Sequence, residues 1–256
     1  MSINSARDFR KEIKKHADRF YLIHYSCQSL NDDNEGLSPR ITSIAVSFFG
    51  NSQVVSFSTH AVAEELGVSR DDVPDKLDEI ERLLLSKFYD FVRDKRDKYW
   101  IHWNMRSLTF GFEHIEHRAN VLGLNNVPSI PIERRINLSD MLGSWYGPNY
   151  VADPKMVSLM DLNGGIHREF LTGLEEVEAF KSKEFIKLHK STLSKVGFFD
   201  RILRKWIKGK LRTKVNSFWV WIDRTFESRA AKLVAFFGTL ASIVSVPLSL
   251  ILWIFS

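Results

Sequence analysis

The segment HWNMR (102–106) brings together side chains that could bind a phosphorylated ligand. It follows a predicted strand, and in α/β sheets ligands bind where strands end. Arg106 could hold a phosphate, helped by the N-terminus of a following helix, and Trp103 could stack on a base. With His102 and Asn104, these residues predict a site for a nucleotide or a nucleic-acid end. A hydrogen-bonded internal network remains the alternative interpretation.

A second polar patch lies on the predicted helix 107–122, which carries Glu113, His114, Glu116, His117 and Arg118. The HExxH spacing of a zinc helix is absent, and a histidine pair three residues apart is common by chance. We therefore interpret the patch as a salt-bridged helix surface and predict no metal site there.

The elements that must position these residues follow from hydrophobic periodicity. Predicted strands cover 20–27, 40–49, 53–59 and 99–103, and predicted helices cover 75–95, 107–122, 138–145, 156–163, 173–187 and 191–205. Gly50-Asn51 marks a hairpin, Asn137 is an N-cap candidate, and Ser191 or Thr192 would cap the last helix. The order predicts an α/β fold whose mixed sheet, flanked by helices, has three leading antiparallel strands and a parallel continuation.

Three stretches resemble the motifs of the DEDD-type 3′–5′ exonucleases, which have a ribonuclease H-like core. HYSCQSL (24–30) resembles the first motif, HWNMRSLTFGFEHIEHRANVLG (102–123) the second, and GLEEVEAFKSKEFIKLHKSTLSKV (173–196) the third. The resemblance covers about residues 20–200. It implies a ribonuclease H-like mixed sheet that brings His24, Ser26 and His189 to the edge where 102–106 lies.

The metal-binding carboxylates of that family have no counterpart in this chain. The Asp and Glu positions of the first motif fall on His24 and Ser26, and the Asp of the second falls near Ser107 or Leu108. In the third, His189 matches a histidine, but the later Asp position falls on Leu193 or Ser194. Because the family's two metal ions need carboxylate oxygens, the resemblance implies a domain that has lost catalysis and needs no cofactor.

Two alternatives remain open. One is an active nuclease with a divergent Mg²⁺ or Mn²⁺ site that uses His24, His189 and Glu113. The other is a membrane scaffold that binds a protein and has no nucleic-acid ligand. Glu175, Glu176 and Glu178 open a predicted helix, where acids complement the helix dipole.

The charge of the chain is unevenly distributed. The 256 residues carry a formal charge of +5, but residues 200–232 alone carry +7, which leaves −2 for the rest. Because the basic excess lies in residues 200–232, the net charge of the chain gives little support for nucleic-acid binding by the domain itself. The single cysteine, Cys27, excludes an internal disulfide, and the first twenty residues show no apolar stretch typical of a signal peptide.

The last 24 residues, 233–256, contain no charged side chain. At about 1.5 Å per residue such a helix spans a bilayer core of about 30 Å. Small residues on one face (Gly238, Ala241, Ser242, Ser245) favour a homo-oligomer through this helix. Positive charge precedes the span, which predicts a single-pass protein of the inner membrane with its N-terminal part in the cytoplasm.

The predicted organisation is thus a soluble domain (1–199), a basic juxtamembrane amphipathic helix (200–232) and a transmembrane helix (233–256). Side chains of the middle segment are expected at anionic lipid headgroups: Lys208, Lys210, Arg212, Lys214, Trp219 and Trp221. A small cytosolic domain joined to one membrane helix suggests, by analogy alone, a role in bacterial defence against phage.

Overall fold

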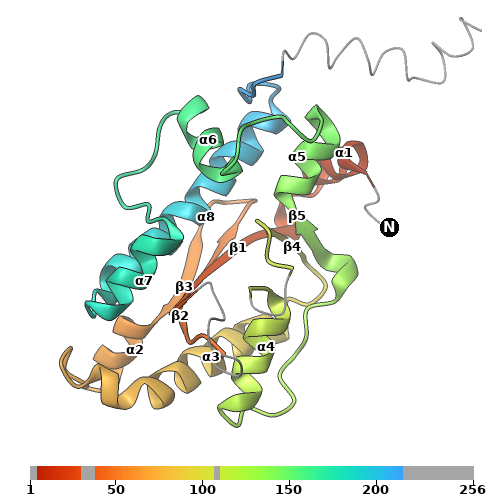
Figure 1. Ribbon diagram of the computed structural model, residues 1–256. Helices are drawn as coiled ribbons and strands as arrows, with labels where there is room; N and C mark the ends of the chain where they lie inside the picture. Colours follow the sequence, from red (N-terminus) through yellow and green to blue (C-terminus); the bar gives the residue numbers. More distant parts are fainter. Residues whose placement is uncertain (1–4, 30–37, 107–109, 216–256) are drawn as a thin grey trace, which may run out of the picture.

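The structure, a computed structural model, describes residues 5–29, 38–106 and 110–215. Over these residues the chain forms a five-stranded sheet in the order β3-β2-β1-β4-β5 (Figure 1). The strands are β1 (Phe20–Cys27), β2 (Ile41–Phe48), β3 (Val54–Ser58), β4 (Tyr99–His102) and β5 (Arg135–Asn137). β2 runs antiparallel to both β1 and β3, whereas β4 is parallel to β1 and to β5. The mixed sheet predicted from the sequence is confirmed.

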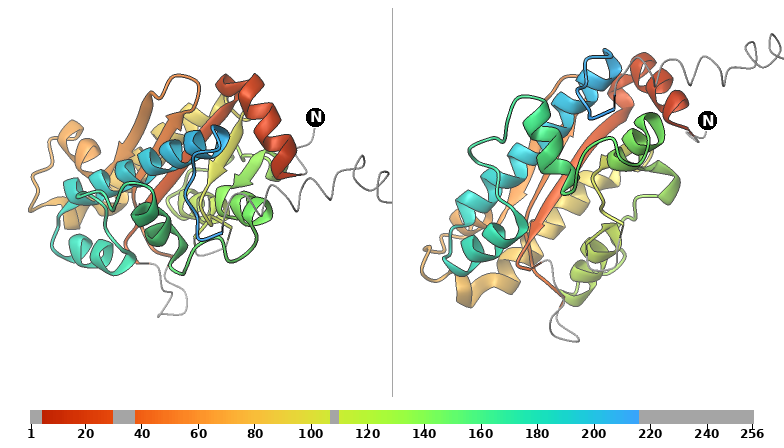
Figure 2. Two further views of the ribbon diagram at one scale, coloured as in Figure 1. Left: turned by 90° about the horizontal axis from the view of Figure 1, so that it is seen from above. Right: turned by 45° about the horizontal axis from the view of Figure 1, so that its top comes forward.

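Helices cover both faces of this sheet (Figure 2). The α-helices are α1 (Ala6–Lys15), α2 (Thr59–Glu65), α3 (Leu77–Arg93), α4 (Phe112–Val121), α5 (Leu138–Tyr146), α6 (Lys155–Leu162), α7 (Gly173–Lys181) and α8 (Phe185–Ile207). Short 3₁₀ turns are η1 (Ala17–Arg19), η2 (Val73–Lys76) and η3 (Ile132–Arg134). α3 and α4 pack on one face, and α1, α5, α6 and α8 pack on the other.

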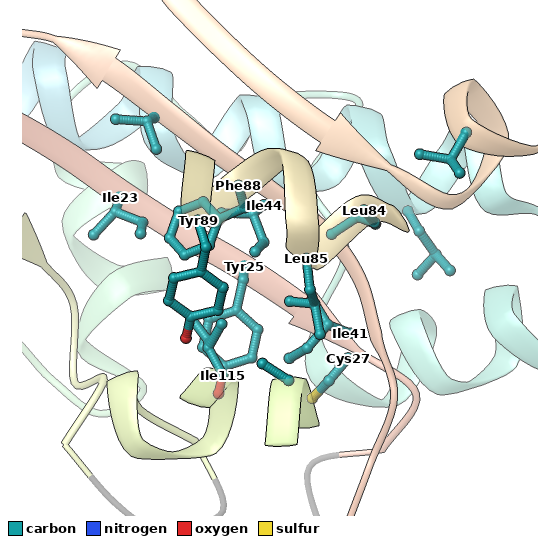
Figure 3. Packing of buried hydrophobic residues seen from close by; sticks show 14 of the residues in the cluster. Ile23, Tyr25, Cys27, Ile41, Ile44, Leu84, Leu85, Phe88, Tyr89 and Ile115 are labelled. Carbon is teal, nitrogen blue, oxygen red and sulfur yellow. The ribbon is translucent and has the colours of Figure 1, made fainter. Parts of the chain in front are cut away.

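β1 is buried along its whole length because helices cover both of its faces. Ile23, Tyr25 and Cys27 point to the core under α3 and α4 (Figure 3), whereas Phe20 and Leu22 point to the core under α8. Burial raises the pKa of the Cys27 thiol to about 12, so this cysteine is not a nucleophile at neutral pH.

The C-terminal helices differ from the sequence prediction. Two helices were expected at 173–187 and 191–205, but the break falls earlier, between α7 and α8. Ser191 and Thr192 therefore lie inside α8 and cap nothing. Their hydroxyls, which would suit an N-cap, are instead bonded to residues of β1, β2 and α7.

Other boundaries also move. α4 begins at Phe112 rather than at 107, and residues 107–109 lie outside the described part. Asn137 caps α5 as expected, because its side chain accepts a hydrogen bond from the Ser139 amide. The sequence prediction missed α2 and β5, which have seven and three residues, and α1, although its buried residues Ala6, Phe9 and Ile13 recur at helical spacing.

α8 continues to Ile207, beyond residue 199, where the soluble domain was expected to end. Residues 211–215, which were expected to start an amphipathic helix, are not helical. Trp219, Trp221 and the predicted transmembrane helix at 233–256 lie outside the described residues. Within the described ranges, no helix is both long enough and apolar enough to cross a membrane.

Candidate functional site

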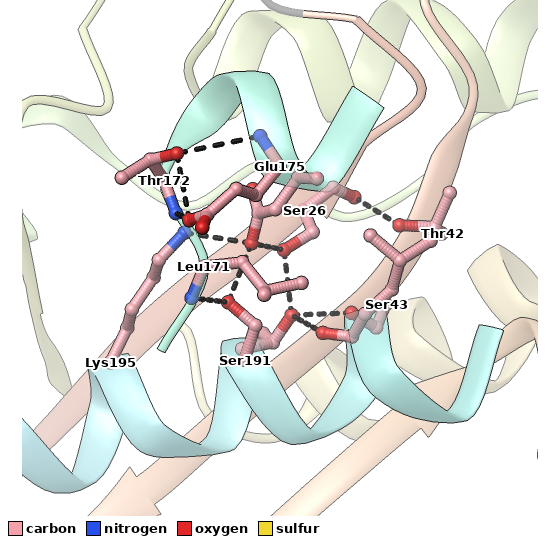
Figure 4. A network of polar contacts seen from close by, with 11 residues as sticks. Ser26, Thr42, Ser43, Leu171, Thr172, Glu175, Ser191 and Lys195 are labelled. Carbon is pink, nitrogen blue, oxygen red and sulfur yellow. Dashed lines mark hydrogen bonds and ion pairs between the residues drawn. The ribbon is translucent and has the colours of Figure 1, made fainter. Parts of the chain in front are cut away.

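A network of buried polar side chains lies between the end of β1 and α8 (Figure 4). Ser26 points to this side of the sheet, and its Oγ lies 2.8 Å from Glu176 Oε1 on α7 and 2.8 Å from Thr192 Oγ1 on α8. Thr192 Oγ1 also lies 2.5 Å from Ser43 Oγ on β2. The network thus joins two strands and two helices that are distant in the sequence.

Glu176 is the centre of this network. Its Oε1 accepts hydrogen bonds from Ser26, from Ser191 Oγ at 2.8 Å and from Lys195 Nζ at 2.7 Å. Lys195 and Glu176 form an ion pair in which the side chains are only 7% and 5% exposed. A carboxylate that already receives three donors in the protein interior has little capacity left for a metal ion.

This is the place where the exonuclease resemblance would put the metal-binding carboxylates. The resemblance would put one carboxylate at Ser26 and another at Leu193 or Ser194, and none of these three residues is acidic. In the three described ranges, no group of three or more His, Cys, Asp or Glu side chains is arranged to hold a metal ion.

His24 lies next along the same face of β1 and is also buried. Its ring packs against Phe199 and Phe110, with ring centroids 5.7 and 5.9 Å away. Burial and the nearby Lys195 hold the pKa of His24 well below its ordinary value. The imidazole is therefore neutral at physiological pH, and the ring belongs to the interior.

The 102–106 segment is placed at the ends of β4 and β5 as expected, but its side chains are largely engaged. Trp103 is 5% exposed and stacks on Phe199 of α8, which leaves no free face for a base. Arg106 is exposed and forms an ion pair with Asp140 at 2.5 Å. Asn104, with φ of 53°, bonds to Asn137 on β5. Trp103 therefore belongs to the interior, whereas Asn104 and Arg106 make their contacts at the surface.

His102 completes that segment as a buried group. Its Nδ1 accepts a hydrogen bond from the Met105 amide at 3.1 Å. Burial and two nearby arginines lower its pKa to about 3, so the ring is neutral and acts as an acceptor for the turn after β4.

The remaining members of the divergent nuclease site are far from one another. His189 lies against β3, where its Nε2 is 2.9 Å from Ser56 Oγ. Glu113 pairs with Arg135 on β5. β3 and β5 are the two opposite edge strands of the sheet. Since His24 is buried between these edges, the three residues do not share one site.

The helix patch at 113–118 is a salt-bridged surface from which His114 and Arg118 reach inward. Arg118 is buried, and its Nε donates to Glu81 Oε1 on α3 at 2.9 Å. Glu81 also accepts from the Ile41 amide at the start of β2. The pair therefore fixes α3, α4 and β2 to one another.

A cavity of about 570 Å³ lies between α2 and the start of α8, outside the predicted site. Its apolar lining includes Ala63, Val68, Val73 and Phe185, and its cations are Arg70, Lys183, Lys187 and Lys190. Glu64, Glu169 and Glu184 also line it. Sequence reasoning missed this cavity, although the spacing of Lys183, Lys187 and Lys190 could have indicated a basic helix face.

His60 lines the same cavity and stands beside His189, with ring centroids 4.9 Å apart. Burial and the neighbouring His60 lower the pKa of His189 to about 4. Burial also lowers the pKa of His60, so both rings are neutral near pH 7. The cavity therefore combines apolar surface, neutral imidazole and ammonium groups.

No protein-family model matches the chain, and no curated protein matches it.

Proposed function

We propose that this chain is a membrane-anchored, non-catalytic protein with a ribonuclease H-like domain that binds a nucleotide or a nucleic-acid end at the cytoplasmic face of the membrane. The observation that carries the proposal is the buried network around Glu176. It has hydroxyl groups and one ammonium group where the exonuclease resemblance would expect metal-binding carboxylates, and the mixed sheet is consistent with the fold that the resemblance implies.

Loss of catalysis follows from the chemistry of those groups. Two-metal hydrolysis needs several carboxylate oxygens that converge on the ions. Here one carboxylate is neutralised by Lys195, and serine and threonine take the neighbouring positions. Binding a divalent ion at this place would require Lys195 to leave a site in which it is 7% exposed.

The cavity between α2 and α8 is the best candidate for the ligand. Its volume lies within the usual range for small-molecule sites, roughly 300–1,000 Å³. A base would pack on the apolar lining near Phe185, and a phosphate would lie near Lys187 and Lys190. Trp103 offers no face to a base because it is 5% exposed and stacks on Phe199, whereas Arg106 is exposed, pairs with Asp140 and lines a smaller cavity of about 360 Å³.

Membrane anchoring is proposed from the sequence of 233–256, which has no charged residue and follows a segment of charge +7.

The test uses the full chain in detergent with radiolabelled mononucleotides and short single-stranded DNA and RNA. We expect binding without cleavage in Mg²⁺ or Mn²⁺, and at least tenfold weaker binding for Lys190→Glu. Lys181→Glu is the matched control, because Lys181 is an exposed lysine on α7 that does not line the cavity.

Hydrolysis that disappears in His189→Ala would overturn the non-catalytic assignment. Equal binding by the two lysine variants would remove the cavity from the proposal. No binding of any of these ligands would leave the scaffold function in its place.

A further inference from the structure

The N-terminal helix α1 is fixed to the C-terminal end of α8. Arg10 Nη2 donates to the carbonyl oxygens of Trp206 and Ile207 at 3.0 and 2.9 Å. The same guanidinium lies 4.3 Å from the ring centroid of Trp145 on α5. Phe9 adds a ring contact with Trp206 at 5.6 Å. The start of the domain and the end of its last helix are therefore one packed unit.

The outer side of α1 is strongly basic. Arg7, Lys11, Lys14 and Lys15 are all exposed, and the first three recur at the spacing of one helix face. The acids of α1 are directed to other groups: Glu12 pairs with Arg19, and Asp8 accepts a hydrogen bond from Ser5.

The segment that leaves α8 is also basic and is held on the domain. Lys208, Lys210, Arg212 and Lys214 are exposed, whereas Leu211 is 3% exposed. The Arg212 backbone makes two hydrogen bonds with the side chain of Asn163 at the end of α6, at 2.8 and 3.1 Å. The Lys214 amide donates to the Tyr150 carbonyl at 2.8 Å.

We propose that the four α1 cations and the four cations at 208–214, together called the basic surface, lie on anionic lipid headgroups and set the orientation of the domain on the membrane. Figure 2, left, shows α1 and the segment after α8 at the same end of the molecule. This inference rests on the proposed membrane anchoring.

The position of the basic surface decides in favour of lipid over nucleic acid. The chain leaves the described domain at residue 215 from this same end and continues to the uncharged run at 233–256. When residues 233–256 insert into a bilayer, that bilayer faces the end of the domain where residue 215 lies. Because 208–214 is bonded to the domain, this end is presented as a fixed surface.

Lysine acetylation read by mass spectrometry tests the inference on the full chain in lipid nanodiscs. We expect Lys11, Lys14 and Lys15 to react at least fivefold more slowly in nanodiscs with 30% phosphatidylglycerol than in pure phosphatidylcholine. One cation near an anionic surface contributes about 1 kcal/mol, which corresponds to an effect of about fivefold. The difference should disappear at 1 M salt, where the Debye length falls to about 3 Å. Lys76 and Lys87 on the far face of the sheet should react equally in both lipids.

Two triple variants provide a matched comparison. Arg7→Glu/Lys11→Glu/Lys14→Glu should abolish the lipid-dependent protection of Lys208 and Lys210. Lys76→Glu/Arg82→Glu/Arg93→Glu, with the same change of charge at the other face of the sheet, should leave that protection intact.

The inference would be overturned by equal acetylation of the α1 lysines in both lipids. If the protein also resists carbonate extraction, the proposed membrane anchor would still hold. Extraction by carbonate would instead overturn the proposed anchor, and this inference with it. Protection of the same lysines by added nucleic acid in phosphatidylcholine nanodiscs, with none from phosphatidylglycerol, would assign the surface to nucleic acid and refute the lipid assignment.

Discussion

Replacing Glu176 by alanine should destabilise the domain strongly, because three donors would lose their shared acceptor. The side chain accepts from Ser26, Ser191 and Lys195, all of them buried. All three hydrogen bonds go to the carboxylate of an ion pair, and such charge-assisted bonds contribute about 1.5–3 kcal/mol each. The loss should therefore be at least roughly 4 kcal/mol, in line with about 3–5 kcal/mol for breaking a buried ion pair.

The double variant Glu176→Leu/Lys195→Met separates charge from packing. It removes both charges and leaves no uncompensated ammonium group in the interior. We expect it to cost much less than Glu176→Ala, since apolar replacement of a buried ion pair is often close to neutral. Lys195→Met alone should lie between the two, because Glu176 would still accept from Ser26 and Ser191.

The measurement is urea unfolding of the full chain in detergent, followed by tryptophan fluorescence. Thermal scans should agree, with a fall in Tm of about 8–16 °C for Glu176→Ala, at roughly 2–4 °C per kcal/mol. A loss below about 1 kcal/mol for Glu176→Ala would mean that the network is open to water. Strict additivity of Glu176→Leu and Lys195→Met in the double-mutant cycle would show that Glu176 and Lys195 are not coupled, and either result refutes the reasoning.

Three further changes test other parts of the structure. His24 and His102 both have lowered pKa values when folded, that of His102 to about 3, so the unfolded chain binds protons that the folded domain excludes. The stability that they contribute is complete above an unfolded pKa of about 6.5 and falls on acidification, by about 1.2 kcal/mol for His102 between pH 6 and pH 5 and further for His24. His102→Gln should remove the His102 part of that loss in urea titrations at the two pH values. Arg118→Ala should lower the free energy of unfolding by about 3 kcal/mol, because it removes the buried partner of Glu81 and leaves only the more exposed Arg40 at 3.5 Å, and a loss within ~0.5 kcal/mol would contradict the buried pair. Deleting 233–256 should move the protein from the membrane pellet to the supernatant, and retention in the pellet would count against the anchor.

The sheet could be predicted because its signals are local. The apolar run FYLIHYSC and the hairpin at Gly50-Asn51 predict β1, β2 and β3, and the periodic apolar residues of 75–95 predict α3. Each of these patterns is complete within a few residues. The parallel direction of β4 followed from connection rules, because α3 lies between β3 and β4 in the sequence and provides the crossover that a parallel strand needs.

The start of the last helix was mispredicted for a physical reason. Ser191 and Thr192 have side chains that favour N-caps, so a helix start was expected there. In the folded chain Thr192 Oγ1 donates to the Leu188 carbonyl within α8. The same hydroxyl also lies 2.8 Å from Ser26 Oγ on β1. A partner 166 positions away leaves no trace in a local pattern.

The sequence by itself determined the mixed α/β sheet, the absence of the exonuclease carboxylates and the uneven distribution of charge. All three depend on residue types, and the sheet also on short periodic patterns. Only the tertiary structure decided which side chains lie around Ser26. Glu176 read as one of several acids at a helix start, yet Glu175 makes the capping box with Thr172 while Glu176 turns inward to Lys195. Which of two adjacent acids is buried depends on how α7 rotates against β1 and α8. That rotation is set by packing across about 150 residues of chain, which no local pattern records.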